Sequence, residues 1–351
     1  MNQRNTICLP GDSPLRSDVA QVSSSAPLPK SELENAPTQK ILIRKPSRVR
    51  PKVPIRNAPE SAPVVKSVSA IQPLFPDLEV ETLIAVGGMG AVYRARQKKL
   101  DRLVALKVLA GDSDSQLNFA SQFRHEAQTL ARLNHPNIVT LYESGEIDRG
   151  PDEPPLIYFL MEFIDGPALE SMLREKSLSL AEIYLLVADV CDGLHYAHEK
   201  GVIHQDIKPA NLLLDSDRSV RLADFGVARM LSDPEDESSD FIMATPQYAA
   251  PELIDPTSFD EPADHRADIY SIGVVLYELI VGRKPGFKKR RPSAVSEASE
   301  RADRVVLKAL QRNPEHRYQS AAELREALLR LAERSEKRWP NLRTWFARKV
   351  A

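Results

Sequence analysis

Long apolar runs are missing from this sequence of 351 residues, and so is a strong excess of charge of either sign. No stretch approaches the ~20 consecutive apolar residues that a membrane-spanning helix needs. The first residues also lack the apolar core of a secretion signal. The formal net charge is only −2, so no overall field favours nucleic acid or an anionic membrane. We therefore expect a soluble, cytoplasmic protein that does not bind nucleic acid.

Cysteine is scarce as well. The chain has two, Cys8 in a polar stretch and Cys191 on the predicted buried face of a helix. Such different surroundings argue against a disulfide framework and fit a reducing compartment. The hydrophobic fraction is 42%, which is enough for a sizeable core in one large domain or two smaller ones.

Aromatic residues are absent from positions 1–72, where proline and serine recur. Such a segment cannot bury enough apolar surface to offset its conformational entropy, so we predict that it is disordered. Between Lys40 and Arg56 the sequence has seven basic residues and no acidic one. This run is interpreted either as a solvated linker or as a docking arm for an acidic partner or surface.

Period-2 patterns and helical patterns follow one another after about residue 75. Strands are predicted at 78–86, 91–97, 102–110, 138–143 and 158–164, and a helix at 116–133. Further helices are predicted between Ser179 and Gly201 and at 267–281, 302–310 and 321–331. Ser179 with Glu182 and Ser320 with Glu323 have the spacing of capping boxes. The pattern predicts a β-rich part joined to a helical part, with a ligand site at the junction.

A glycine-rich turn and a lysine lie in the β-rich part. The turn Gly87-Gly88-Met89-Gly90 stands between two predicted strands, and glycine allows the close backbone approach that a phosphate needs. Alone the turn is a weak signal, because ordinary hairpins use glycine too. Lys107 alternates with Ala105 on one face of the next strand. A cation there needs an anion to hold it, and Glu126 on the following helix is the candidate.

The most specific stretch is Val202-Ile203-His204-Gln205-Asp206-Ile207-Lys208-Pro209-Ala210-Asn211-Leu212-Leu213. It resembles the catalytic loop of eukaryotic-like Ser/Thr protein kinases. Asp224-Phe225-Gly226, Ala250-Pro251-Glu252 and the Asp268-to-Gly273 run resemble further motifs of that family and come in family order. Arg317 matches the arginine that pairs with Glu252. The resemblance covers about 250 residues, and several stretches are most similar to bacterial members.

The resemblance implies an α+β, two-lobed protein kinase fold with a small β-rich N-lobe and a larger helical C-lobe. The kinase domain would span 78–331, with the N-lobe at about 78–164 and the C-lobe at about 165–331. It would follow the disordered 1–72 segment and precede a basic, amphipathic tail at 332–351. The implied activity is transfer of the γ-phosphoryl group of ATP to Ser or Thr hydroxyls of proteins, with Mg²⁺ or alternatively Mn²⁺. A pseudokinase scaffold with little turnover is the alternative.

The resemblance also assigns roles residue by residue. Asp206 would accept or orient the hydroxyl proton, and Lys208 would contact the γ-phosphate. Asn211 and Asp224 would hold the metal ions. Thr245 is similar to the family threonine that binds the catalytic aspartate and lysine, and it favours Ser/Thr acceptors.

ATP would lie between the lobes. Lys107, fixed by Glu126, would hold the α- and β-phosphates. The turn over the phosphates would comprise Ala85, Val86, Gly87, Gly88, Met89 and Gly90. The adenine would contact Val92, Ala105, Met161, Leu213 and the backbone from Glu162 to Ile164. If this account is right, Lys107 and Asp224 must face each other.

Three departures from the family pattern change what we expect. Ala85 replaces the first glycine of the phosphate turn, which predicts somewhat weaker ATP binding. Gln205 replaces the arginine before the catalytic aspartate, and glutamine cannot pair with a phosphate dianion as arginine does. Phosphorylation of the activation segment is therefore not predicted to be a strict switch. The basic stretch 283–300 has proline, glycine and serine where many relatives place an extra helix.

The tail after Leu331 carries aromatic and basic residues. Trp339, Leu342, Trp345 and Phe346 fall near one helical face among arginines and lysines. Two interpretations stay open. The tail is either a last helix packed on the large lobe, or an amphipathic helix that contacts a membrane surface or a partner.

Overall fold

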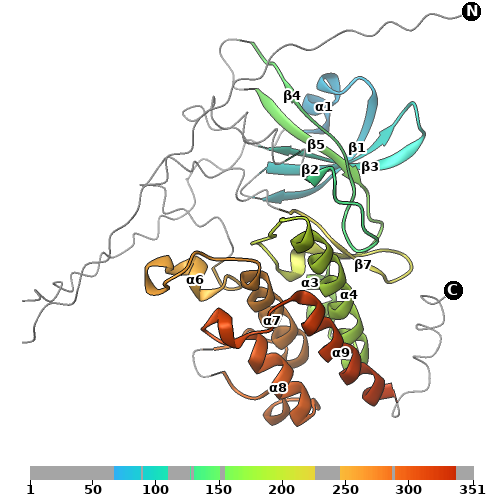
Figure 1. Cartoon of the computed structure of the whole chain (residues 1–351). Helices are drawn as coiled ribbons and strands as arrows, with labels where there is room; N and C mark the ends of the chain where they lie inside the picture. Colours follow the sequence, from blue (N-terminus) through green and yellow to red (C-terminus); the bar gives the residue numbers. More distant parts are fainter. Residues whose placement is uncertain are drawn as a thin grey trace, which may run out of the picture. The chain divides into compact units, whose positions relative to one another are not determined.

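The computed structural model describes residues 67–87, 90–109, 127, 130–150, 155–225, 246–286 and 289–336. Most of the predicted N-terminal segment, most of the predicted helix at 116–133 and the tail after residue 336 lie outside this range. The described residues form a β-sheet followed by a group of helices (Figure 1). Within them, no helix has both the length and the apolar composition needed to cross a bilayer.

The sheet has five antiparallel strands in the order β1-β2-β3-β5-β4. Their bounds are β1 Leu78–Gly87, β2 Gly90–Gln97, β3 Arg102–Leu109, β4 Leu141–Ile147 and β5 Leu156–Glu162. Side chains alternate between its two faces. One face places Tyr93, Leu106 and Leu160 in register, and all three are buried in one core cluster. The opposite face carries Val92, Lys107 and Phe159 in the next register row.

Order begins earlier than the sequence indicated. The short helix α1 (Val68–Ile71) and the 3₁₀ turn η1 (Gln72–Leu74) lie mostly within the segment predicted to be disordered. Ile71 is fully buried in the sheet core, and the Gln72 side chain accepts a hydrogen bond from Val80 N at 2.8 Å. These contacts pack the segment against the sheet. Composition alone could not predict this packing.

The fourth and fifth strands are shifted from their predicted positions. β4 begins at Leu141 and β5 at Leu156 rather than at 138 and 158. Ile138 instead forms an isolated parallel bridge with Leu222. Val139 donates its N–H to Leu222 O at 3.0 Å, and Leu222 donates to Asn137 O at 2.8 Å. These backbone groups are thus taken by a segment about 80 residues away, which strand periodicity cannot reveal.

The helical part confirms the four helices predicted for it, with shifted ends, and adds α3 (Leu169–Glu175) and α6 (Pro251–Ile254), which were not predicted. The other main helices are α4 (Leu180–Glu199), α7 (Arg266–Val281), α8 (Glu300–Ala309) and α9 (Ala321–Glu336). The other shorter elements are η2 (Pro209–Asn211), β6 (Leu212–Leu214), β7 (Val220–Leu222), η3 (Pro256–Ser258), η4 (Pro292–Ala294) and η5 (Pro314–His316). α9 lies alongside α4 (Figure 1). α7 is buried all round, as its nearly continuous apolar sequence predicts.

The capping boxes were predicted from the sequence, and the first is confirmed in full. Ser179 Oγ accepts from Glu182 N, and the Glu182 carboxylate accepts from Ser179 N at 2.9 Å. At α9, Ser320 Oγ accepts from Glu323 N at 3.2 Å. The Glu323 carboxylate, however, accepts from the N–H of Gln319. The second box is therefore only half formed as predicted.

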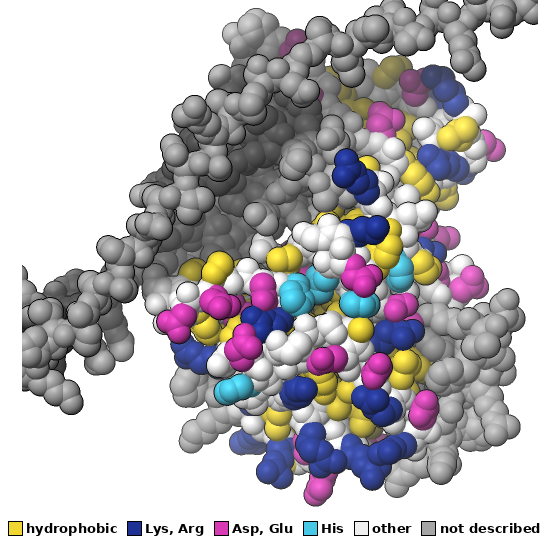
Figure 2. Space-filling view, in the orientation of Figure 1, with side chains coloured by type: hydrophobic (Ala, Val, Ile, Leu, Met, Phe, Trp, Pro, Cys, Tyr) yellow, Lys and Arg dark blue, Asp and Glu magenta, His cyan; other side chains and the backbone are white. Residues whose placement is uncertain are grey.

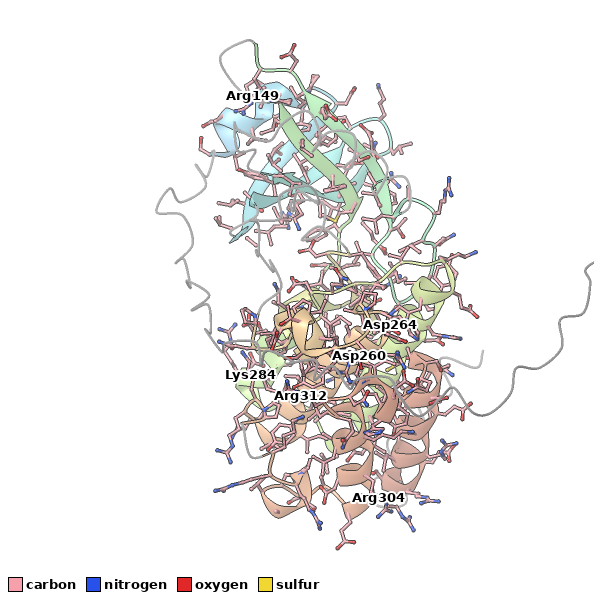
Figure 3. The ribbon with its side chains drawn as sticks, turned by 60° about the vertical axis from the view of Figure 1, so that its left-hand side comes forward. Arg149, Asp260, Asp264, Lys284, Arg304 and Arg312 are labelled. Carbon is pink, nitrogen blue, oxygen red and sulfur yellow. The ribbon has the colours of Figure 1, made fainter. Side chains whose placement is uncertain are left out.

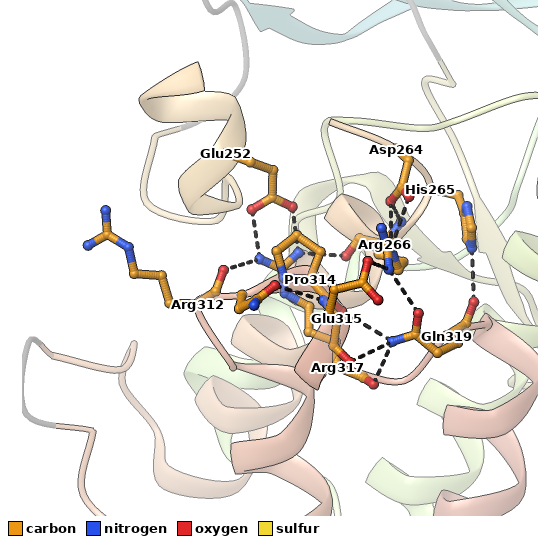
Figure 4. A network of polar contacts seen from close by, with 10 residues as sticks. Glu252, Asp264, His265, Arg266, Arg312, Pro314, Glu315, Arg317 and Gln319 are labelled. Atoms are coloured by element: carbon orange, nitrogen blue, oxygen red, sulfur yellow. Dashed lines mark hydrogen bonds and ion pairs between the residues drawn. The ribbon is translucent and has the colours of Figure 1, made fainter. Parts of the chain in front are cut away.

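A buried ion pair joins α6 to the loop before α9, as predicted. Arg317 donates to both carboxylate oxygens of Glu252, at 2.5 and 2.7 Å. The guanidinium also donates to the carbonyls of Gln311, Arg266 and Arg312. Figure 4 shows this network, in which every edge of the guanidinium has an acceptor. A buried charge loses its hydration, so it is stable only when hydrogen bonds and an ion pair replace the lost water contacts.

Candidate active site

Lys107 and Asp224 meet, although they lie 117 positions apart. The Lys107 ammonium donates to Asp224 Oδ1 at 2.8 Å, and the lysine is only 5% exposed. Its β3 neighbours Leu106 and Val108 are buried on the other face of the sheet. The lysine is thus held on the face that the period-2 pattern predicted. Its predicted partner Glu126 lies outside the described residues.

Asn211 and Asp224 lie at adjoining ends of a small hairpin. β6 and β7 pair with Leu212 opposite Leu222, and Ala223 N donates to Asn211 O at 2.9 Å. Asp224 has a left-handed backbone with φ of 61°, a conformation in which aspartate is enriched among non-glycine residues. The hairpin therefore brings an amide and a carboxylate from separate motifs to one place.

Asp206 is the best-anchored acid of the site. It is 8% exposed, and its Oδ2 accepts from Lys208 Nζ at 2.6 Å and from Asn211 Nδ2 at 3.1 Å. Asn211 also donates to the Asp206 carbonyl at 2.8 Å. Hydrogen bonds from a cation and an amide fix the orientation of this carboxylate. The three predicted catalytic-loop residues are thus in mutual contact.

Asp268, in the first turn of α7, accepts hydrogen bonds from the backbone of this loop. No such role was predicted for it. Its Oδ1 accepts from Gln205 N at 2.8 Å, and its Oδ2 accepts from His204 N and is hydrogen-bonded to His198 Nε2, both at 2.8 Å. Burial alone would raise the pKa of Asp268, but the His198 bond and charge and the His204 N–H outweigh burial, and the pKa is lowered. Gln205 sits at a φ of 62°, so this strained residue next to Asp206 is tied down by a charged acceptor.

The sequence did contain a signal for Asp268. It is a lone aspartate in the first turn of α7, a helix that is mostly buried and mostly apolar. A buried carboxylate must be paired or hydrogen-bonded. We interpreted the run only as the start of a central helix, because the partners His204 and Gln205 lie more than 60 positions away.

An apolar cavity lies behind Lys107. Met161 and Phe159 of β5 line it together with Phe225, Leu130 and others. Phe225 contacts His204 with ring centroids 4.5 Å apart. Phe225, Leu130 and Leu141 all line this cavity. Met161 also lies on its wall, and its predicted contact with adenine stays a prediction.

The residues predicted to contact adenine come from both parts of the fold. Val92 and Ala105 lie on the Lys107 face of the sheet, and Leu213 lies half-buried on β6. Glu162 donates its N–H to Thr140 O at 2.9 Å. The Glu162 N–H is therefore not available to the adenine base. A backbone hydrogen bond between Glu162 and the base would have to use the Glu162 carbonyl.

Two glycines of the predicted turn, Gly87 and Gly90, differ in whether the fold requires glycine at their position. Gly90 has a φ of 140°, and a Cβ there would lie 2.0 Å from Val108 O. Packing against β3 therefore already requires Gly90. A Cβ at Gly87 would meet nothing within 4 Å, so the fold does not explain why Gly87 is glycine. Ala85 and Val86, also predicted in the turn, lie exposed on β1 opposite Val92 and Ala91.

Four predicted site residues lie outside the described part of the chain. They are Gly88, Met89, Glu126 and Thr245. The activation segment between Phe225 and Pro246 also lies outside it. Their predicted roles stay predictions.

Comparison with known proteins agrees with this geometry. The sequence model of the protein kinase domain matches residues 78–346. The chain belongs to the protein kinase family. The chain is 37% identical over 274 residues to the serine/threonine-protein kinase PknB of Mycolicibacterium smegmatis, and this match covers 73% of the chain. It is 38% identical over 271 residues to PknB of Mycobacterium tuberculosis and 36% identical over 275 residues to PknJ of the same species.

The solved structures give the same family. The crystal structure of the Mycobacterium tuberculosis PknI kinase domain is 29% identical, with a TM-score of 0.58, and the match covers 73% of this chain and 96% of that one. The chain spans less than half of the length of the curated relatives, 43% for PknB of Mycolicibacterium smegmatis and 45% for PknJ. These relatives place the chain among bacterial-type Ser/Thr protein kinases and bear out the predicted kinase fold.

Proposed function

We propose that this chain transfers the γ-phosphoryl group of ATP to serine and threonine hydroxyls of proteins. One observation carries the proposal: Asp206 lies in a preformed hydrogen-bonded group with Lys208 and Asn211, while Lys107 reaches Asp224 from the sheet. Phosphoryl transfer needs positioning and charge stabilisation more than covalent chemistry by the protein. A base, two cations and a candidate metal-binding pair supply both.

Asn211 and Asp224 suit a hard divalent cation. An amide oxygen and a carboxylate are oxygen ligands, and Mg²⁺ is usually bound by one or two carboxylates together with substrate phosphates. When bound, the ion neutralises charge on the phosphates. Lys107, now paired with Asp224, is a cation within reach of the same place and would hold the α- and β-phosphates.

The reaction places a substrate hydroxyl at Asp206. As the hydroxyl oxygen forms its bond to the γ-phosphorus, the bond between that phosphorus and the leaving oxygen of ADP breaks. The hydroxyl proton passes to the Asp206 carboxylate. Lys208, which donates to Asp206 Oδ2, keeps the carboxylate oriented and adds positive charge where the phosphoryl oxygens develop charge.

The test is transfer of radiolabelled phosphate from ATP to a generic basic protein, in Mg²⁺ and separately in Mn²⁺. Wild type should transfer phosphate, and Asp206→Asn should lose most activity because asparagine cannot accept the proton. Asp217→Asn serves as the matched control, since Asp217 is an exposed aspartate in the β6–β7 turn. Equal transfer by wild type and Asp206→Asn would refute the proposed role.

A pseudokinase scaffold is the second candidate, favoured by two departures from the family pattern, Gln205 and Ala85. ATP would then raise the unfolding temperature without any transfer. Wild type that binds ATP but transfers nothing in either metal supports the scaffold and contradicts the enzyme.

Regulation is expected to differ from arginine-containing relatives. Gln205 donates its backbone N–H to Asp268, and its amide cannot form the strong pair with phosphate that arginine forms. Replacing Ser232, Ser238 and Ser239 together by alanine should therefore leave most transfer activity. A large loss in a folded triple variant would contradict this expectation.

The predicted location and partners extend the proposal. The protein would act in the cytoplasm on protein substrates, and the basic run at 40–56 would serve as a linker or as an arm for an acidic partner. Cell fractionation tests the first prediction. Comparing the proteins captured by the full chain with those captured by a chain lacking residues 1–66 tests the second.

A further inference from the structure

The helical part has a large groove far from the candidate active site. It has a volume of about 1160 Å³ and is bordered by α3, the first turns of α4, the end of α7, the segment before α8, and the last turns of α9. Pockets for small ligands usually span roughly 300–1,000 Å³, so this groove has room for several large side chains. Arg304 stands on its rim, and Figure 3 shows Arg304 at the end of the helical part away from the sheet.

Apolar side chains of α3, α7 and the segment before α8 line one part of the groove, and serines, glutamates and arginines line the rest. Leu173 and Leu178 are half-buried, and each packs against the main core with one side. Val295 is 39% exposed and is one of seven large hydrophobic side chains that are exposed in the described part of the chain. These side chains leave apolar surface open to solvent in this part of the groove.

The stretch between α7 and α8 borders the groove on one side. Between α7 and α8 the described residues contain only the 3₁₀ turn η4. Val281 at the end of α7 and Val295 line the groove on the side where this stretch runs.

The segment after α9 starts at the edge of the groove. Leu331 and Arg334 of α9 line it, and the described part of α9 reaches Glu336. Pro340 follows four residues later, and a proline inside a helix clashes with the carbonyl four residues before it and removes a helical hydrogen bond. The sequence therefore favours a change of chain direction after α9. Trp339 follows Arg334 by five residues, which can span at most about 17 Å.

The composition of this segment matches the groove. Positions 337–351 contain both tryptophans of the chain, together with Leu342 and Phe346. We propose that residues 337–351 fold back and place Trp339, Trp345 and Phe346 in the groove, completing the helical part. This interaction does not depend on phosphoryl transfer.

Charge does not drive the contact. The segment has five basic residues and no acidic one, while the rim carries arginines as well as Glu297 and Glu300. Figure 2 shows Lys and Arg side chains gathered at this end of the molecule. Burial of aromatic surface, helped by arginines stacking on indole faces, must therefore dominate. The contact should persist at high salt, where charge attraction is screened.

The position of the tryptophans gives a selective experiment. Because Trp339 and Trp345 are the only two tryptophans, tryptophan emission and its quenching by acrylamide report on this segment alone. In the full chain, emission should lie at shorter wavelength and quenching should be weaker than in urea. Val295→Glu should shift both toward the urea values. Leu100→Glu, at a 61% exposed site in the β2–β3 turn, should change neither.

A substitution in the tail itself controls for the case in which Val295→Glu acts only by unfolding the groove. Phe346→Asp lies outside the described lobe and should raise quenching as Val295→Glu does, while far-ultraviolet circular dichroism stays unchanged. Strong quenching of wild type, or a folded Val295→Glu protein with unchanged quenching, would overturn the proposal. Shielding that depends on protein concentration would assign the contact to a second copy. Shielding that appears only with anionic phospholipid vesicles would assign it to a lipid surface, and either result overturns the proposal too.

Discussion

Replacing Asp268 by asparagine should impair catalysis through the position of the catalytic loop. The carboxylate has two oxygens for three donors: Gln205 N, His204 N and His198 Nε2. Asparagine keeps the shape but offers one acceptor oxygen, and its NH₂ group would face at least one of these donors. The Asp268→Asn protein therefore loses at least one hydrogen bond to a charged acceptor and leaves a buried donor unsatisfied.

The cost follows from burial. Asp268 is 0% exposed, so water cannot replace the lost acceptor. A hydrogen bond to a charged group contributes roughly 1.5–3 kcal/mol, and an unsatisfied buried donor costs about 1–3 kcal/mol. Because these two terms overlap, we expect the free energy of unfolding to fall by about 2–4 kcal/mol. Urea unfolding measures this change.

The catalytic effect is separate from the stability effect. If Gln205 N loses its acceptor, the strained backbone at Gln205 can relax and move Asp206 with it. A displacement of about 1 Å can reduce the rate roughly 100-fold. We therefore expect kcat to fall by about that factor at a temperature where the variant is folded. KM for ATP should change little, since Lys107 and the sheet are unaffected.

A matched control separates the two effects. Asp303 is also a buried aspartate, and it accepts hydrogen bonds from the backbone N–H and hydroxyl of Ser293 on the far side of the helical part. Asp303→Asn should lower stability by a comparable amount and leave kcat unchanged. If Asp268→Asn lowers stability as expected but keeps the wild-type kcat, Asp268 does not position the catalytic loop.

Three further predictions follow from the same contacts. Gly87→Ala should leave the unfolding free energy unchanged and raise KM for ATP. Gly90→Ala should lower the unfolding free energy by about 1–3 kcal/mol because of its backbone angle, and by more if the clash with β3 is not relieved. Equal urea midpoints for the two variants would contradict this difference. Glu252→Gln should lower the free energy of unfolding by about 3–5 kcal/mol, because it leaves the buried Arg317 charge without an anion. A loss below about 1 kcal/mol, within the range of an exposed ion pair, would show that three backbone carbonyls and the new carboxamide are sufficient acceptors for Arg317. Since the pKa of Asp268 is lowered in the folded state, its contribution is present above its ordinary pKa of 3.8 and is lost as pH falls through the folded pKa. The stability difference between wild type and Asp268→Asn should therefore shrink as pH falls below 3.8.

Local sequence patterns were sufficient for most of the regular elements. α4 has its apolar stripe and its capping box within a single run of residues, and its ends were predicted to within two residues. β3 was predicted because alternation sets which residues share a face, and Lys107 was placed on the correct one. The predicted catalytic residues Asp206 and Asn211 lie five positions apart, so their contact is also nearly local.

Contacts between distant segments could not be predicted from such patterns. Periodicity says which face of an element is buried, but not which residue of another element meets it. Only the tertiary structure tied Asp268 to the backbone of Gln205 and showed that β3 requires Gly90 to be glycine. The resemblance required Lys107 and Asp224 to face each other, and the structure shows them in a direct ion pair. Resemblance to a family supplied the Glu252–Arg317 pair in advance, because that pair recurs in relatives and not because its spacing reveals it.

The sequence by itself thus predicted most of the long helices and strands and, through a resemblance, the family and the candidate reactive side chains. Its information is local, since hydrophobic period, caps and short motifs act over a few residues. The tertiary structure decided which charges neutralise one another, which strained residue the fold holds in place, and where a partly apolar groove stays open beside the end of α9. These outcomes depend on burial, and burial is fixed only when segments far apart in the chain pack together.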